Sequence, residues 1–151
     1  MVPDTINREI VIDAPRTTVW AIVTEAQHLS GWLSDEAEID LRPGGSMRLT
    51  WHGHGTYMAR IETVERPSKF AFRWRTRKGE PSEVNSTLVV VTLDVEGDGT
   101  RLRIIESGFA ALPWPEEEQA RYLEENAKGW TIELDELRVY AAENAAAGRK
   151  R

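Results

Sequence analysis

Residues 127–141 read AKGWTIELDELRVYA, in which apolar side chains recur at intervals of three and four residues. This spacing places them on one face of a helix, and such a face is stable only when another element covers it. The residues of this face are Ala127, Trp130, Leu134, Leu137 and Ala141. Glutamates at residues 116–118 precede them, where the positive end of a helix dipole favours carboxylates. We therefore predict one long amphipathic helix near the C-terminus.

Gly129 stands out in this segment, because glycine inside a helix costs roughly 1 kcal/mol relative to alanine. We expect either a kink that divides the segment into two helices, or another element that packs close to the glycine backbone. The tail from Ala145 to Arg151 consists of alanine, glycine and basic residues, and we expect it to fray.

Upstream of the helix, apolar and polar residues alternate in successive segments, which is typical of strands with one buried face. These segments lie at residues 47–51, 57–63, 70–76, 87–95 and 102–104. Gly, Pro or Asp residues separate them, at residues 53–55, 66–68, 78–81 and 96–99. Tight turns require these residue types, so the pattern predicts a meander of antiparallel strands.

The N-terminal part predicts another strand and two short helices. Ile6, Ile10 and Ile12 alternate within residues 5–13, which we expect to form the first strand. Pro15 then favours a helix start, where its missing N–H costs nothing. The elements expected next are a helix over about residues 15–25, a helical turn over 27–33, and a strand opened by Ile39 and Leu41 and closed by the turn at 43–45.

These elements together predict an α+β fold, in which a curved antiparallel sheet of six to seven strands wraps around the long C-terminal helix. The two short helices follow the first strand. At 151 residues the chain corresponds to one domain, residues 1–151, with a core at about residues 6–142.

Composition excludes several classes of site. The chain has no cysteine, which rules out disulfides, thiolate metal sites and cysteine nucleophiles and fits a reducing cytoplasm. Its net charge of −6 disfavours a nucleic-acid partner. No secretion signal and no apolar run of about 18 residues is present, so we expect neither export nor a membrane span.

Large aromatic side chains fall on the inner face of the expected sheet, namely Trp51, Tyr57, Phe70, Phe72 and Trp74. A gap between a curved sheet and a helix is a natural ligand site unless side chains fill it. The loop before the long helix carries two more aromatic residues, a position suited to a lid. The residues expected to line the ligand cavity are Trp51, Tyr57, Phe72, Trp74, Glu106, Phe109, Trp114, Trp130 and Leu134.

Glu106 follows Leu102 and Ile104 on the inward face of the last strand, where a carboxylate is costly unless it is paired. Three interpretations stay open. The carboxylate orients a ligand or acts as a general base, it forms a structural pair with an arginine or a tyrosine, or the strand end reaches water. A raised pKa of Glu106 would favour the first interpretation.

The histidines do not point to a metal. His52 and His54 lie at a tight turn that exposes both side chains, and a catalytic zinc needs three protein ligands. We therefore expect no metal and no cofactor. His28 is expected at the surface or as a helix cap.

Cationic side chains alternate with the aromatic face on two strands and therefore share the outer surface of the sheet. They are Lys69, Arg73, Arg75, Arg77, Arg101 and Arg103. They form either a basic patch for an acidic partner or pairs with Glu and Asp on neighbouring strands. We favour the pairs, which are common on the outer faces of antiparallel sheets.

Seven sequence features, taken in order, resemble one known family. They are the first strand, Ala14-Pro15 with Val19-Trp20, Leu29 with Trp32, Pro43-Gly44-Gly45, Val64-Glu65-Arg66-Pro67 before Phe70-Ala71-Phe72-Arg73-Trp74, Gly99-Thr100-Arg101-Leu102 with Ser107-Gly108-Phe109, and Gly129-Trp130 with Leu134 and Leu137. The family is the activator of heat-shock protein 90 ATPase homologue (AHSA) group of the START and birch-pollen-allergen-like superfamily. The resemblance covers roughly residues 6–142. It implies the helix-grip fold, an incomplete barrel around the C-terminal helix with an internal cavity.

Relatives in this superfamily bind lipids, sterols or aromatic polyketides, and some catalyse cyclisation or hydrolysis. The resemblance thus implies, as first hypothesis, a protein that binds a hydrophobic or aromatic small molecule. The second hypothesis is a module that binds or stimulates a chaperone ATPase. The third is a cyclase or hydrolase with Glu106 as base, which we rank last because the sequence offers no second catalytic group. We expect a monomer or a homodimer.

Overall fold

A computed structural model describes residues 3–75 and 84–149 of the chain. In chain order its elements are β1 (Thr5–Ile12), α1 (Arg16–Thr24), α2 (Ala26–Trp32), β2 (Glu36–Ile39), β3 (Ser46–Trp51), β4 (Gly55–Glu65), β5 (Lys69–Arg75), β6 (Ser86–Glu96), β7 (Gly99–Ser107), the short 3-10 helix η1 (Phe109–Ala111) and α3 (Glu116–Arg149). The turn expected at 78–81, and the residues Thr76 and Arg77, lie outside the described residues. The order confirms the predicted α+β helix-grip architecture.

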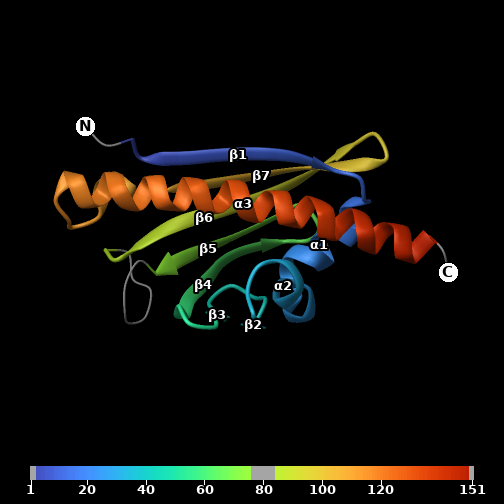
Figure 1. The fold of residues 1–151 in the computed structure, drawn as a ribbon, viewed down its shortest axis with the longest axis horizontal. Helices are drawn as coiled ribbons and strands as arrows, with labels where there is room; N and C mark the ends of the chain where they lie inside the picture. The colour runs from blue at the N-terminus through green and yellow to red at the C-terminus, as the bar shows by residue number, and fades with distance from the viewer. Residues whose placement is uncertain (1–2, 76–83, 150–151) are drawn as a thin grey trace.

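The seven strands form one antiparallel sheet in the order β1-β7-β6-β5-β4-β3-β2. Strands β2 to β7 pair with their neighbours in sequence, whereas β1 pairs with β7 at the far edge (Figure 1). The short helices α1 and α2 carry the chain from one edge to the other. A register shift between Ile61 and Thr63 interrupts the ladder of β4 and β5, and such bulges increase the local twist of a sheet.

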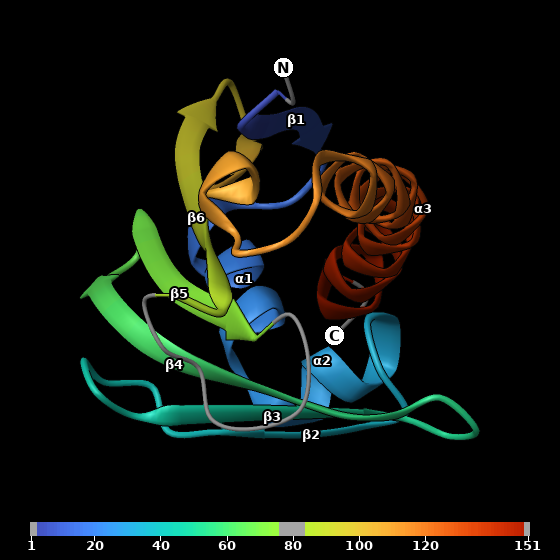
Figure 2. The same cartoon turned by 90° about the vertical axis from the view of Figure 1, so that its left-hand side faces the viewer.

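The sheet curves strongly, and α3 lies along its open side. Figure 2 shows the curve from β1 at the top to β2 at the bottom, with α3 on the right. The core fills the concave side between the sheet and the three α-helices. Leu134, Leu137 and Ala141 of α3 are buried there, which confirms that the predicted apolar stripe is the buried face of the helix.

Helix α3 differs from the expectation in two respects. It is one helix, and a Cβ atom built at Gly129 would have no neighbour within 4 Å, so the predictions of two helices or of a closely packed element are wrong. The helix also continues beyond residue 142, and Ala145, expected in a frayed tail, is buried. None of the described helices combines the length and the apolar character needed to cross a membrane.

The second strand starts earlier than expected and ends at Ile39. The chain then turns, with the N–H of Arg42 bonded to the carbonyl of Asp40. Gly44 in this turn has a φ of 85°, a conformation that glycine adopts without strain. Leu41 therefore lies outside the sheet.

Candidate functional site

An open pocket of about 970 Å³ lies between the inner face of strands β3 to β5 and the N-terminal half of α3. Its lining residues are Trp51, His54, Tyr57 and Trp74 from the strands and the β3–β4 turn, Trp114 from the loop before α3, and Glu118, Arg121, Tyr122, Glu125, Asn126 and Gly129 from α3. The α3 residues recur mostly at intervals of three and four, so they share one face of the helix. We name this space the outer pocket.

A smaller pocket of about 200 Å³ continues the outer pocket toward the core. The two share Trp51, Trp74, Glu125, Asn126 and Gly129. The smaller pocket adds Leu33, Leu49, Phe72, Glu106, Trp130 and Glu133. We name it the inner pocket, and together the two adjoining pockets form the candidate site.

Three aromatic rings form the sheet side of this site. Tyr57 and Trp74 stack with ring centroids 6.0 Å apart. Trp51 packs edge-on against both, with its centroid 5.5 Å from Tyr57 and 6.4 Å from Trp74. The indole N–H of Trp51 donates a hydrogen bond of 2.9 Å to the carbonyl of Leu33, which orients the ring. The sheet therefore offers a preformed aromatic wall to a ligand.

Tyr122 stands on the helix side, next to the loop that leads into α3. Its ring lies 5.7 Å from that of Phe109 and 5.3 Å from that of Trp114, measured between centroids. Burial raises the pKa of the Tyr122 phenol above its ordinary value. The loop aromatics are thus held by Tyr122 and pack onto α3.

Glu106 lies at the inner end of the site and is only 1% exposed. Thr87 donates a hydrogen bond of 2.5 Å to its Oε2, and the indole N–H of Trp130 donates one of 2.8 Å to its Oε1. The amide of Asn126 donates to both oxygens, at 3.1 and 3.3 Å. Burial raises the pKa of Glu106, although these three donors act in the opposite direction.

The contacts of Glu106 correct the expected partners. The carboxylate is paired, but with threonine, asparagine and tryptophan rather than with an arginine or a tyrosine. The alternative that the strand end reaches water is wrong, because the side chain is buried. Three strand and helix segments, β6, β7 and α3, meet at this one carboxylate.

Glu133 is a second carboxylate of the inner pocket, and its pairing is incomplete. The side chain is half-buried, and its Oε2 atom is buried without a hydrogen-bond partner. Burial, then the charge of nearby Glu136 and a side-chain hydrogen bond with it, raise the pKa of Glu133 to about 7. The inner pocket therefore contains one carboxyl group with donors at both oxygens, Glu106, and one, Glu133, that contacts the carboxyl group of Glu136 and has an Oε2 atom without a hydrogen-bond partner.

The structure brings most of the predicted site residues together. The outer and inner pockets include Trp51, Tyr57, Phe72, Trp74, Glu106, Trp114 and Trp130. Phe109 is fully buried beneath Tyr122, and Leu134 is buried in the core, so neither lines these two pockets. The Tyr57 hydroxyl donates to the carbonyl of His54 at 3.4 Å.

The site also includes helix residues that the sequence did not point to. Tyr122, Asn126, Gly129 and Glu133 are spaced four, three and four residues apart, and Glu118, Arg121 and Glu125 lie beside them. This spacing forms a second stripe along the same helix, beside the apolar stripe. A polar stripe at helical spacing is the signal that would have found them.

The histidines take different roles. His52 is exposed and its Nε2 lies 3.1 Å from Glu36, while His54 lines the outer pocket. Nδ1 of His28 lies 2.8 Å from the Tyr140 hydroxyl, so His28 links α2 to α3 rather than capping a helix. Within the described part of the chain, no group of three His, Cys, Asp or Glu side chains is suited to hold a metal ion.

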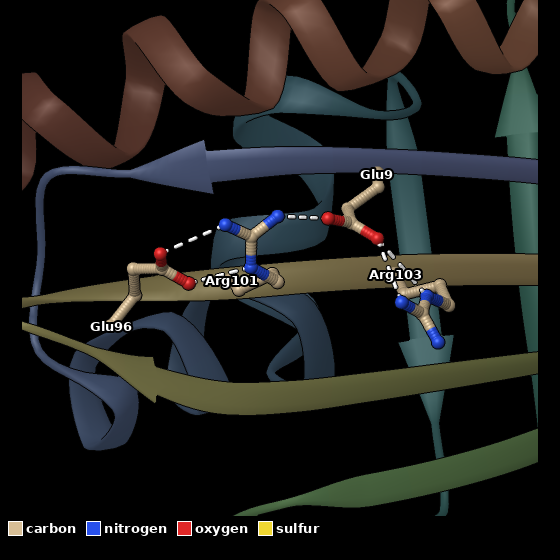
Figure 3. A network of polar contacts seen from close by, with 4 residues as sticks. All are labelled: Glu9, Glu96, Arg101 and Arg103. Atoms are coloured by element: carbon tan, nitrogen blue, oxygen red, sulfur yellow. Dashed lines mark hydrogen bonds and ion pairs between the residues drawn. The ribbon is translucent and has the colours of Figure 1, made fainter.

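The outer face of the sheet carries cross-strand ion pairs. Figure 3 shows Arg101 between Glu9 and Glu96, and Arg103 beside Glu9. Nη2 of Arg103 lies 2.8 Å from Oε2 of Glu9. Arg103 and Arg101 hold the pKa of Glu9 below its usual range. Arg73 and Lys69 pair in the same way with Glu62 and Glu65, at 3.0 and 3.9 Å. The favoured interpretation of these cations as paired groups is therefore confirmed for the described side chains.

Comparisons with known proteins agree with this architecture. The model of the family described as Activator of Hsp90 ATPase homolog 1-like protein matches residues 13–142. No curated protein sequence matches the chain. Among solved structures, protein MLL2253 from Mesorhizobium loti has a TM-score of 0.76 and 22% identity, over 90% of this chain and 95% of that chain.

Two further solved structures carry descriptive names. The solution structure of the Aha1 dimer from Colwellia psychrerythraea has a TM-score of 0.72 and 18% identity, over 91% of this chain and 94% of that chain. PFC0360w, an HSP90 activator from Plasmodium falciparum, has a TM-score of 0.72 and 20% identity, over 91% of this chain and 95% of that chain. At these identities the likeness shows the fold alone. Because the family model spans most of the sequence and its helix-grip fold is present, the chain belongs to the Activator of Hsp90 ATPase homolog 1-like family.

Proposed function

We propose that this protein binds a hydrophobic or aromatic small molecule in the outer and inner pockets. The observation that carries this proposal is the open pocket of about 970 Å³, whose preformed aromatic wall leads inward to a smaller pocket. Ligand sites are typically concave, mostly apolar, and supplied with few polar groups. Trp51, Tyr57 and Trp74 provide the apolar surface here.

Fluorescence titration tests this proposal with N-phenyl-1-naphthylamine, an uncharged probe whose emission rises in apolar surroundings. Gly129→Leu directs a large side chain into both pockets, because the space around a Cβ at this position is empty. We expect saturable binding to the wild type and at least about tenfold weaker binding to Gly129→Leu, the loss that about 1.4 kcal/mol produces. Lys128→Leu, on the exposed side of the same helix, is the control.

The outcome of this titration is decisive in both directions. Saturable binding that Lys128→Leu retains and Gly129→Leu loses supports the pocket as the site. Absence of saturable binding to the wild type, or equal affinity of the two variants, overturns the proposal. Circular dichroism of both variants establishes that α3 is intact.

A second candidate function is that of a partner of a chaperone ATPase, and with it a role in the stress response. The family description and the HSP90 activator among the similar folds favour it. The test is the ATPase rate of the host's Hsp90 with and without this protein, and with Arg73→Glu. Arg73 lies on the outer face of the sheet, paired with Glu62. If the protein raises the ATPase rate and Arg73→Glu raises it less, this candidate is supported. If the protein leaves the ATPase rate of Hsp90 unchanged, this candidate is contradicted.

A third candidate, an enzyme of cyclase or hydrolase type with Glu106 as base, has weaker support. Both oxygens of Glu106 already accept hydrogen bonds from protein donors, with which a substrate proton would have to compete. Unchanged turnover by Glu106→Gln would end this candidate.

For each of these functions we propose a cytoplasmic location, in keeping with the cysteine-free sequence. We also propose that the protein acts as a monomer or a homodimer.

A further inference from the structure

The charged side chains of the two pockets are mostly acidic. Glu118 and Glu125 line the outer pocket, and Glu125 and Glu133 line the inner pocket together with Glu106. Among the described lining residues, Arg121 is the one with a permanent positive charge, and it lies exposed at the outer pocket. The inner pocket has no cationic lining residue in the described part of the chain.

The two carboxylates of the inner pocket differ in their hydrogen bonding. Glu106 accepts bonds from Thr87, Asn126 and Trp130, and needs nothing further. Oε2 of Glu133 is buried and accepts none. A buried acceptor without a donor costs free energy, which a ligand recovers when it brings the missing donor or a positive charge. Glu133 is therefore an acceptor to which a ligand cation can bind.

The aromatic wall favours the same kind of ligand. The faces of indole and phenol rings carry negative potential and attract a cation that lies within about 6 Å of the ring centroid. Trp51 and Trp74 line both pockets, and Tyr57 stacks on Trp74. A ligand in the inner pocket thus meets ring surfaces on the sheet side and Glu133 on the helix side. Apolar surface and carboxyl oxygens coincide there.

We propose that the ligand is an organic cation, an apolar or aromatic molecule whose ammonium group lies between the aromatic wall and Glu133. This inference rests on the proposed small-molecule function and names the chemical class of its ligand. An anionic ligand would face Glu125 and Glu133 in the inner pocket and could pair only with Arg121, outside it. Burial next to like charges is costly for such a ligand.

Three test ligands of nearly equal shape distinguish the effect of ligand charge on affinity from the effect of apolar contact. Benzyltrimethylammonium is the cation, neopentylbenzene is its uncharged carbon analogue, and phenylmethanesulfonate is the anion. Their affinities are measured on the full chain by the change in tryptophan fluorescence. We expect the cation to bind at least about fivefold more tightly than the uncharged analogue, the ratio that a partly desolvated cation–π contact produces. The sulfonate is expected to bind most weakly.

Glu133→Gln tests the named acceptor, with Glu143→Gln as matched control. Both substitutions replace a carboxyl group of α3 with an amide, but Glu143 is exposed and lines neither pocket. We expect Glu133→Gln to reduce the preference for the cation to within about twofold, while Glu143→Gln keeps it. Binding of the uncharged analogue is expected to remain in both variants.

The alternative results are distinguishable. If the uncharged analogue binds as tightly as the cation, or the sulfonate binds best, the inference on charge is wrong and the small-molecule function stands. If none of the three molecules binds while the N-phenyl-1-naphthylamine titration also fails, both proposals are wrong. A cation preference that Glu133→Gln retains in full contradicts the role of Glu133.

Discussion

The indole nitrogen of Trp130 donates a hydrogen bond of 2.8 Å to Oε1 of Glu106, and this bond joins α3 to β7 at the inner end of the pocket. Because Glu106 is buried, water could not freely take the place of the indole donor if Trp130 were replaced. The same carboxylate also binds Thr87 of β6, so the contact contributes to the position of the helix over the sheet. Helix and sheet are thus tied together where the candidate ligand would bind.

Trp130→Phe is expected to lower the free energy of unfolding by about 1–3 kcal/mol, because it removes a donor from a buried carboxylate. Urea denaturation measures this loss. A double-mutant cycle with Glu106→Met separates the hydrogen bond from the lost ring volume, and we expect a coupling energy of about 1 kcal/mol or more. Additive effects of the two substitutions would show that the bond contributes nothing.

Gly129→Ala is expected to raise the free energy of unfolding by about 1 kcal/mol, because alanine favours the helix and its Cβ meets no atom within 4 Å. Gly31→Ala in α2 is the matched comparison. Its Cβ would lie 2.7 Å from the ring of Tyr140, whose hydroxyl is held by His28, so we expect a loss of stability. Thermal or urea unfolding of the two variants measures both effects, and equal effects would contradict the account of the space at Gly129.

The titration of Glu133 predicts stability that falls as the pH rises. Burial and the charge of Glu136 raise its pKa from 4.5 to about 7, so the folded chain holds the proton more tightly than the unfolded chain. This contribution is complete below about pH 4.5 and is lost as the pH rises through about 7. Relative to the wild type, Glu133→Gln should therefore gain more in melting temperature at about pH 8 than at about pH 5.

The difference in melting temperature between wild type and variant, followed with pH, reports on Glu133 together with its interaction with Glu136. Glu106 and Glu125 share the inner pocket with it, and both are unchanged in the variant. The pKa of Glu106 is raised as well, so the wild-type curve alone contains more than one titration. The melting temperature of Glu143→Gln should change with pH as that of the wild type does. The same pH dependence for Glu133→Gln and the wild type would contradict the raised pKa of Glu133.

Glu9→Gln removes one carboxylate from the outer-face network of Arg101 and Arg103. These side chains are partly exposed, and such ion pairs contribute little and are screened by salt. We expect a smaller loss of stability than for Trp130→Phe, and one that shrinks further in about 1 M sodium chloride. A large loss that is independent of salt would show that the network is more important than its exposure indicates. Paired urea curves at the two salt concentrations make the measurement.

The periodicity of the sequence was sufficient for the fold. Alternation in the strands and the three- and four-residue spacing of α3 correctly predicted the order of elements and the buried stripe that includes Leu134 and Leu137. Boundaries were less accurate, because backbone hydrogen bonds rather than hydrophobic pattern decide where a strand ends. Leu41 shows this, since the turn after Ile39 removes it from the sheet.

The sequence indicated the aromatic residues of the candidate site and Glu106, but neither the partners of Glu106 nor the polar residues of α3. Trp51, Tyr57 and Trp74 were foreseeable, because aromatic residues at alternate positions share the inner face of a sheet. The partners of Glu106 were not, since Thr87 and Asn126 come from distant segments that only tertiary packing brings to one carboxylate. The periodicity of a sequence does not show which residues of distant segments contact one side chain.

The most direct test of ligand binding in the pocket is a titration of the tryptophan-labelled protein with N-phenyl-1-naphthylamine, followed by the indole N–H signals in NMR spectra. Of the six tryptophans, Trp51, Trp74 and Trp114 line the outer pocket, while Trp20 is buried in the core and lines neither the outer nor the inner pocket. We expect the signals of the first three to shift and saturate with one dissociation constant, and the signal of Trp20 to stay unchanged. Absence of saturable shifts at the pocket tryptophans, or equal shifts at Trp20, would contradict it.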